Sequence, residues 1–272
     1  HRPGVHVPGM RHDNGGGVRY DAYASVQARY SAVGQAADAQ QVELVGERTA
    51  PLDALRAAHY LTLGLNGFHT RGGVRYAARS LAWGLERAQP GAAANGSVPQ
   101  GAAGVSCRLR GGVEWQDRVV ASNTVLSGRY TGLQGQWRCA APDGGLWQVS
   151  GQWGRERARD ASRPGGDQVQ TGLRGTRLWP ARQWAPAAWV SAGDLQLDAE
   201  YSRSSDRVGY SPLLESGRIR QVDRWALRAE LQQRQGPNTQ WLWGVEWLHQ
   251  RSNLSLFSVR SVGPYVALRA VW

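Results

Sequence analysis

Two cysteines carry the clearest chemistry in this chain of 272 residues. Cys107 and Cys139 lie symmetrically about residue 123, inside the turn-like stretch "VVASNT". An antiparallel hairpin centred on that turn would place the two side chains opposite each other, on one face. A disulfide is therefore one prediction, and two free thiols are the alternative. Because neither a third cysteine nor a close histidine accompanies them, no metal site is predicted.

A catalytic set is not expected. His249, Ser252 and Asn253 have the residue types of an esterase site. However, Ser252 and Asn253 are adjacent, so their side chains would point to opposite faces of a strand. The sequence also contains no P-loop, dinucleotide-binding glycine set or zinc motif. We therefore expect a non-enzymatic protein without a cofactor.

Charged residues recur on one side of alternating segments. Oppositely charged residues on neighbouring strands would form ion-pair ladders across a polar interior. One interpretation is that these pairs only satisfy the interior of a narrow barrel. The functional interpretation is an arginine-lined, net-positive path for anions or acidic oligosaccharides. The candidates are Arg19, Arg29, Arg108, Arg110, Arg174, Asp194, Asp198, Glu200, Arg224, Arg228 and Glu230.

The composition is unusual in its basic and aromatic residues. All 32 basic residues are arginine, and the formal net charge is +11. Such a charge would often indicate a polyanionic partner, whereas a high-GC genome that replaces lysine by arginine is the alternative. No nucleic-acid partner is expected, so the strand faces that carry the arginines matter more than their number. The chain also has 13 Trp but only two Phe.

The elements that must position these residues are strands. Alternation with a period of two recurs, and helical periodicity is scarce. In 145–157, for example, Trp147, Val149 and Trp153 alternate with polar residues. We predict twelve strands, at 18–30, 41–49, 56–68, 73–86, 103–118, 123–138, 145–158, 167–179, 187–204, 218–234, 239–252 and 260–272. Ten or 14 strands stay open as alternatives.

These strands are longer than the five or six residues usual in globular sheets. Strands with one apolar face, one polar face and aromatic residues near their ends are typical of transmembrane β-barrels. The predicted fold is therefore all-β, a single antiparallel transmembrane β-barrel over 1–272, with a periplasmic leader segment at 1–17. The aromatic side chains expected to face lipid are Trp115, Trp147, Trp153, Trp225, Trp241, Trp243 and Trp247.

Barrel topology provides a check on the strand count. Both ends of a bacterial barrel face the periplasm, where connections are short. The predicted connections satisfy this rule from the C-terminus backwards, but the long Pro/Gly/Ala stretch at 87–102 does not. We expect the last strand to pair with 18–30 and so to close the barrel.

The C-terminal sequence "PYVALRAVW" looks like the signal that the outer-membrane barrel assembly machinery reads, in which apolar residues alternate before a closing aromatic residue. The residues that match are Pro264, Val266, Leu268, Ala270 and Trp272. This resemblance implies a Gram-negative outer-membrane protein.

Residues 200–272 also resemble the barrel domain of the surface lipoprotein assembly modifier family, whose barrels follow tetratricopeptide repeats. Arg220, Asp223 and Arg224 match a strand start, and Ser252 and Asn253 match the connection before the closing strand. Members of that family have a barrel of about 14 strands and help to deliver lipoproteins to the cell surface. This chain departs from the pattern, because it has twelve predicted strands and no helical repeats. A repeat domain would have to lie upstream of His1.

Three functions are consistent with these expectations. The first is a non-enzymatic outer-membrane barrel for passage or surface assembly of a protein or polymer. The second is a narrow, arginine-lined porin for anions or acidic oligosaccharides. The third is a structural membrane anchor of a larger envelope complex. The expected partners are outer-membrane lipid, the barrel assembly machinery and a surface lipoprotein, an exported polymer or an envelope complex.

Overall fold

A computed structural model gives the conformation of most of the chain. It describes residues 4–7, 12–13, 18–29, 39–70, 73, 75–89, 105–184, 193–211, 213, 215–234 and 239–271. In this part of the chain, the helices are one short α-helix, α1 (Ala181–Trp184), and the 3-10 helices η2 (Asp53–Leu55), η3 (Thr124–Leu126), η5 (Glu215–Gly217) and η6 (Ser255–Phe257). None of the helices described has the length and apolar character needed to cross a membrane.

The remaining elements are strands of one sheet. Two short strands, β1 (Gly4–Val7) and β2 (His12–Asp13), precede twelve long ones. The long strands are β3 (Arg19–Arg29), β4 (Ala39–Leu52), β5 (Ala57–Thr70), β6 (Arg75–Gln89), β7 (Ser106–Val120), β8 (Gly128–Ala140), β9 (Leu146–Ala158), β10 (Gln168–Trp179), β11 (Asp194–Gly209), β12 (Ile219–Arg234), β13 (Thr239–Ser252) and β14 (Val259–Val271).

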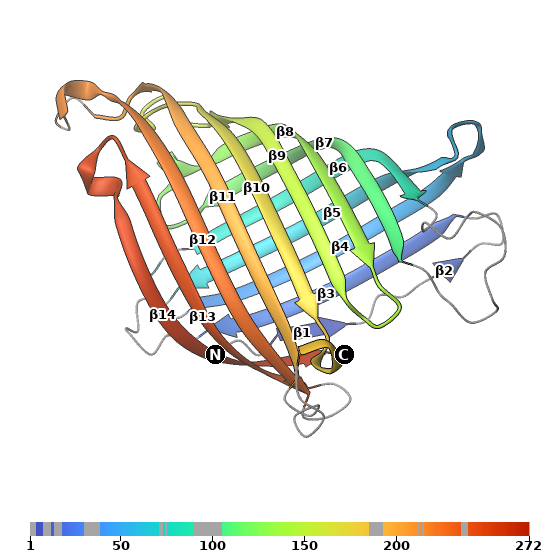
Figure 1. Ribbon diagram of the computed structural model, residues 1–272. Helices are drawn as coiled ribbons and strands as arrows, with labels where there is room; N and C mark the ends of the chain where they lie inside the picture. Colours follow the sequence, from blue (N-terminus) through green and yellow to red (C-terminus); the bar gives the residue numbers. More distant parts are fainter. Residues whose placement is uncertain are drawn as a thin grey trace, which may run out of the picture.

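Each long strand pairs with its neighbour in sequence, and all of these pairings are antiparallel. Figure 1 shows the sheet coiled so that β3–β6 run behind β9–β12 with the opposite slant. The prediction of an all-β chain with twelve antiparallel strands is therefore confirmed. The stretch 87–102, which the topology rule did not fit, covers the end of β6 and the connection towards β7, and residues 90–104 lie outside the described part.

The N-terminal strand β1 lies between β3 and β14, the first and last long strands, where the sequence predicts that these two strands pair directly. β1 pairs in parallel with β14 and antiparallel with β3, and β2 also pairs with β3. The prediction that 260–272 pairs with 18–30 is thus wrong for the described pairings. Residues 4–7 and 12–13, within the predicted leader segment 1–17, are strands of the same sheet. Because twelve successive strands alternate in direction, β3 and β14 run in opposite directions. A strand that lies between them must therefore run parallel to one of the two. The pairings return from β14 to β3 through β1, which is compatible with a closed barrel.

The two faces of the sheet have opposite character, and the polar face is the better buried. Large apolar side chains such as Leu63, Trp83, Trp153 and Trp243 are about half exposed on the outer face. Asp198, Glu156 and Glu230 are buried on the inner face. Since soluble domains bury apolar side chains instead, this distribution reverses the usual order of a protein interior.

A disulfide joins the hairpin formed by β7 and β8. Cys107 and Cys139 are direct partners in the register, and their sulfur atoms are bonded. The strand β8 begins at Gly128 rather than at residue 123, because 124–126 form the turn helix η3. Ser127 then accepts a hydrogen bond from the Val120 amide at 3.0 Å, which holds this turn against the end of β7.

Removal of the disulfide is expected to destabilise the protein moderately. The bond closes a sequence separation of 32 residues, and bonds of this kind typically stabilise a fold by about 2–4 kcal/mol. The double variant Cys107→Ser/Cys139→Ser should lose that amount in a urea titration. Dithiothreitol should lower the wild-type midpoint to the level of the variant and should leave the variant unchanged. Equal midpoints for all four samples would contradict this prediction.

Candidate functional site

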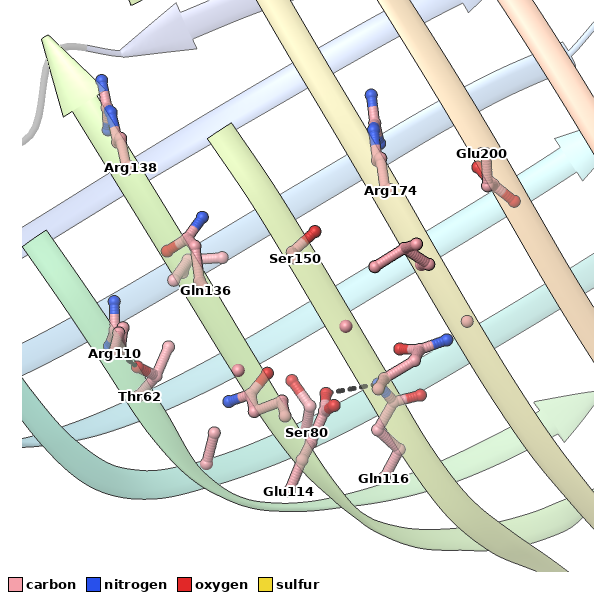
Figure 2. A pocket seen from close by; sticks show the side chains of 18 of the residues that line it. Thr62, Ser80, Arg110, Glu114, Gln116, Gln136, Arg138, Ser150, Arg174 and Glu200 are labelled. Atoms are coloured by element: carbon pink, nitrogen blue, oxygen red, sulfur yellow. Dashed lines mark hydrogen bonds between the residues drawn. The ribbon is translucent and has the colours of Figure 1, made fainter. Parts of the chain in front are cut away.

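The inner face of the sheet encloses a polar cavity of about 900 Å³, which residues from β4 to β11 line. Figure 2 shows Gln136, Ser150 and Arg174 projecting from neighbouring strands into this space. The period of two positions them, because alternate residues of a strand share one face. The lining consists mainly of Gln, Ser, Arg and Glu side chains, so it suits water and hydrophilic solutes.

The charges in the cavity nearly cancel, with one carboxylate in excess. Three arginines line it, Arg110, Arg138 and Arg174, together with four glutamates, Glu43, Glu47, Glu114 and Glu200. We had expected a net-positive interior, and this cavity does not have one. The physical reason is that a guanidinium group is costly to enclose without a carboxylate nearby. Glu47 on β4 supplies this carboxylate for Arg110, and Asp198 on β11 supplies it for Arg174.

Contacts within the cavity join strands that are not neighbours. Arg110 on β7 is paired with Glu47 on β4 at 2.6 Å, and it also donates to the Thr62 hydroxyl at 3.1 Å. Its guanidinium group lies 3.4 Å from the ring centroid of Tyr60 on β5. Gln134 on β8 donates to the Tyr60 hydroxyl at 3.4 Å. Because β4 and β7 are three strands apart, these side chains bridge one part of the interior.

A second network covers the inner face from β10 to β14. Arg174 is paired with Asp198 at 3.0 Å, and Arg228 is paired with Glu246 at 3.3 Å. The hydroxyl of Tyr265 donates to Glu230 at 2.7 Å. Asp198 and Arg228 are register partners, as an ion-pair ladder requires. They are nevertheless not each other's described ion-pair partners, because Asp198 is paired with Arg174 on β10 and Arg228 with Glu246 on β13.

The other charged candidates lie in several places. Arg19 is paired with Asp21 at 2.6 Å, and Arg108 is paired with Glu86 at 3.4 Å. Asp194 accepts a hydrogen bond from the Ala181 amide at 3.1 Å, so it serves the connection between β10 and β11. The structure also places Glu200 in the cavity lining and Arg224 in an exposed position on β12. The side chain of Arg29 lies outside the described residues.

One buried ion cluster has a member that strand periodicity could not predict. Glu156 at the end of β9 is paired with Arg118 at 2.7 Å and with Arg163 at 2.5 Å. Arg163 belongs to the connection between β9 and β10, yet it is almost fully buried. Connections do not follow the alternation of strands, so the sequence pattern gave no signal for this residue.

The tryptophans expected to contact lipid all lie at outer-face register positions. Trp115, Trp153 and Trp243 are among the exposed large apolar side chains. The ring centroid of Trp147 lies 4.1 Å from the guanidinium carbon of Arg177. The others are Trp225, Trp241 and Trp247, which are partly exposed.

The residues of the C-terminal signal lie on β14 or just beyond it. Val266 and Pro264 are exposed on the outer face, opposite Trp243 and Val245 of β13. Leu268 and Ala270 follow at alternate positions of the same strand. The side chains of these two residues, and the whole of Trp272, lie outside the described part.

The candidate esterase residues do not form a site. His249 lies on the outer face, with ring centroids 5.7 Å and 5.9 Å from those of Trp225 and Trp247. The Ser252 hydroxyl donates to the Gln221 carbonyl at 2.8 Å, and Asn253 accepts from the Gln221 amide at 2.7 Å. Ser252 and Asn253 therefore attach the β13–β14 connection to the start of β12.

The strand-start residues Arg220 and Asp223 also have structural partners. Arg220 donates to the two oxygens of the Asp206 carboxylate from Nε and Nη2, both at 3.1 Å. Asp223 accepts from the Tyr201 hydroxyl at 2.8 Å. Among the described residues, no group of three His, Cys, Asp or Glu side chains could hold a metal ion.

Comparisons with known proteins identify no relative. No protein-family model, no curated protein and no solved structure matches the chain. The class of protein that the fold defines is thus an all-β protein whose twelve long strands pair antiparallel in one sheet, compatible with a β-barrel. Membership of the surface lipoprotein assembly modifier family stays a prediction from the sequence resemblance.

Proposed function

We propose that this protein is a non-enzymatic β-barrel of a bacterial outer membrane, and that its polar interior is a narrow pore for small hydrophilic solutes. The observation that supports the proposal is the reversed distribution of side chains. The outer face presents exposed Leu, Val and Trp, while the inner face encloses a polar cavity of about 900 Å³. Transmembrane barrels pair every strand because backbone groups cannot face lipid unbonded.

The cavity favours a pore for small solutes over passage of a protein or polymer. Side chains from β4, β5, β7 and β8 meet within it, around Arg110, Glu47 and Tyr60. A polymer would have to displace these contacts, whereas ions and small solutes can pass beside them. Passage or surface assembly of a protein or polymer remains the broader prediction from the resemblance.

A second function, the structural anchor, is favoured by the same bridging contacts. If Arg110–Glu47 and the Glu156 cluster closed the interior, the barrel would hold an envelope complex without conducting. Conductance separates these two functions.

The protein reconstituted in a planar bilayer is expected to conduct, with weak selectivity between potassium and chloride because the cavity charges nearly cancel. Arg138→Glu changes three cavity arginines to two and adds a fifth carboxylate. Charged groups lining a pore set its ion preference, so this variant should favour potassium several-fold over the wild type.

Arg182→Glu makes the same charge change on α1, outside the cavity lining, and should leave the selectivity unchanged. Absence of any conductance from folded protein would refute the pore and support the anchor. Equal effects of the two variants would show that the path lies elsewhere.

A further inference from the structure

Four arginines gather on the outer face of β6–β9, at the ends of the strands far from the C-terminus. Arg79, Asp117, Arg129 and Arg157 are successive register partners across these four neighbouring strands. Arg159, just beyond β9, also contacts Asp117. With strands about 4.8 Å apart, the row spans roughly 14 Å. We call Arg79, Arg129, Arg157 and Arg159 the arginine patch.

The patch has more positive charge than its carboxylate can neutralise. Asp117 is only 3% exposed, because Arg79 at 2.8 Å, Arg129 at 3.9 Å and Arg159 surround it. The side chains of Arg79 and Arg129 are themselves 68% and 65% exposed. One carboxylate therefore organises the guanidinium groups and leaves a net charge of about +3 facing outwards.

The neighbouring carboxylates already have other partners. Asp167 accepts a hydrogen bond from Arg155 at 2.5 Å and from the Ala158 amide at 2.9 Å. Burial alone would raise the pKa of Asp167, but these hydrogen bonds outweigh it and hold the pKa below its usual value. Asp160 accepts from the hydroxyl and the amide of Ser162 at 2.7 Å and 2.8 Å. Asp167 also interacts electrostatically with Arg157 of the patch, but the carboxylate in contact with Arg79, Arg129 and Arg159 is Asp117 alone among the described ion pairs. The patch therefore keeps an excess of positive charge that an anion would balance.

The outer face directly beside the patch is apolar. The next outer-face positions on β6 and β7 are Leu81 and Trp115. On β9, the outer-face residue after Arg155 is Trp153. All three side chains are exposed. A free anion would use the guanidinium groups but not this surface. A lipid would use both, with its phosphate on the arginines and its acyl chains on the apolar side chains.

We propose that the arginine patch binds the phosphate of an anionic lipid headgroup, whose acyl chains lie against Leu81, Trp115 and Trp153. This inference rests on the proposed function, because the outer face must be in a membrane. It assigns a lipid site to one end of the barrel wall. On β6 the opposite end of the outer face carries a single exposed arginine, Arg87.

The test is native mass spectrometry of the full chain in detergent, after incubation with equal amounts of phosphatidylglycerol and phosphatidylcholine. The wild type should retain phosphatidylglycerol preferentially. Arg129→Gln/Arg157→Gln should lower that preference roughly 10-fold or more, since each arginine near an anionic headgroup contributes about 1 kcal/mol. This variant keeps the Asp117 contacts with Arg79 and Arg159, so it should fold. The matched control Arg87→Gln/Arg182→Gln removes the same charge elsewhere and should bind as the wild type does.

Each remaining outcome is decisive. Equal retention of the two lipids, or an equal loss in the control variant, would overturn the lipid site. Displacement of the lipid by millimolar inorganic phosphate would show a site for free anions instead, which also overturns it. Flotation with phosphatidylcholine vesicles tests the membrane proposal by itself. Failure to float would refute the proposed function and this site together, whereas flotation without lipid preference would refute only the site.

Discussion

Replacement of Gly84 by alanine is expected to prevent or severely weaken folding. Gly84 on β6 and Gly112 on β7 are register partners, and the hydroxyl of buried Tyr60 lies over both. A Cβ atom at position 84 would lie 2.1 Å from the Gly111 carbonyl oxygen and 2.6 Å from the Gly112 Cα atom. Because these are backbone atoms, the strands themselves must move apart, at a cost of about 3 kcal/mol.

The measurement is the free energy of unfolding in urea, together with the folded fraction after refolding in detergent. Gly67→Ala on β5 is the matched control, since nothing lies within 4 Å of a Cβ atom there. Alanine generally suits a strand interior better than glycine does, by roughly 0.5–1 kcal/mol. The control should therefore be neutral or slightly stabilised. A Gly84→Ala variant as stable as the control would show that β6 and β7 do not approach so closely.

An arginine placed on the outer face should impair membrane assembly, whereas one on the inner face should not. Leu133 in the middle of β8 is 54% exposed on the outer face, and Gln136 on the same strand lines the cavity. Arginine at the lipid-facing midplane of a barrel costs about 2–4 kcal/mol. Leu133→Arg is therefore expected to lose most of its folding yield in phosphatidylcholine vesicles.

Gln136→Arg adds the same charge to the same strand, but in a polar cavity that also contains four glutamates. Its folding yield should stay close to that of the wild type, as followed by the shift in gel mobility between unheated and heated samples. The reverse order of the two variants would mean that the outer face does not meet lipid. That result would refute the proposed membrane function.

The strands could be predicted from the sequence because their period of two is a local property. Residues such as Trp147 and Val149 alternate with polar neighbours whatever the rest of the chain does. The pairing of Cys107 with Cys139 could be predicted for the same reason, since a hairpin places partners at equal distances from its turn. The position of β1 between β3 and β14 could not be predicted from the sequence. Its four residues carry too short a pattern, and the pairing joins opposite ends of the chain.

The interior was predictable only in part. Alternation identified which charged residues share the inner face, including Arg174, Asp198 and Arg228. It could not identify their partners, because a guanidinium group reaches either neighbouring strand or beyond. The Arg110–Glu47 contact depends on how strongly the sheet coils, which no local pattern encodes. Arg163 and the arginine patch depend on the connections and on the ends of the strands, where periodicity stops.

The order of the strands has a consequence for how the fold forms. Every pairing from β3 to β14 joins segments that follow each other in the chain, so successive hairpins can form with small losses of loop entropy. Among the pairings of the described residues, only that of β1 with β14 joins residues that are more than 250 positions apart. It is the contact of longest range, and we expect it to form last. Until then the sheet has two free edges, and unpaired edges recruit other strands. The period before β1 pairs with β14 is therefore when the edge of the C-terminal strand is unpaired and the chain is most exposed to aggregation.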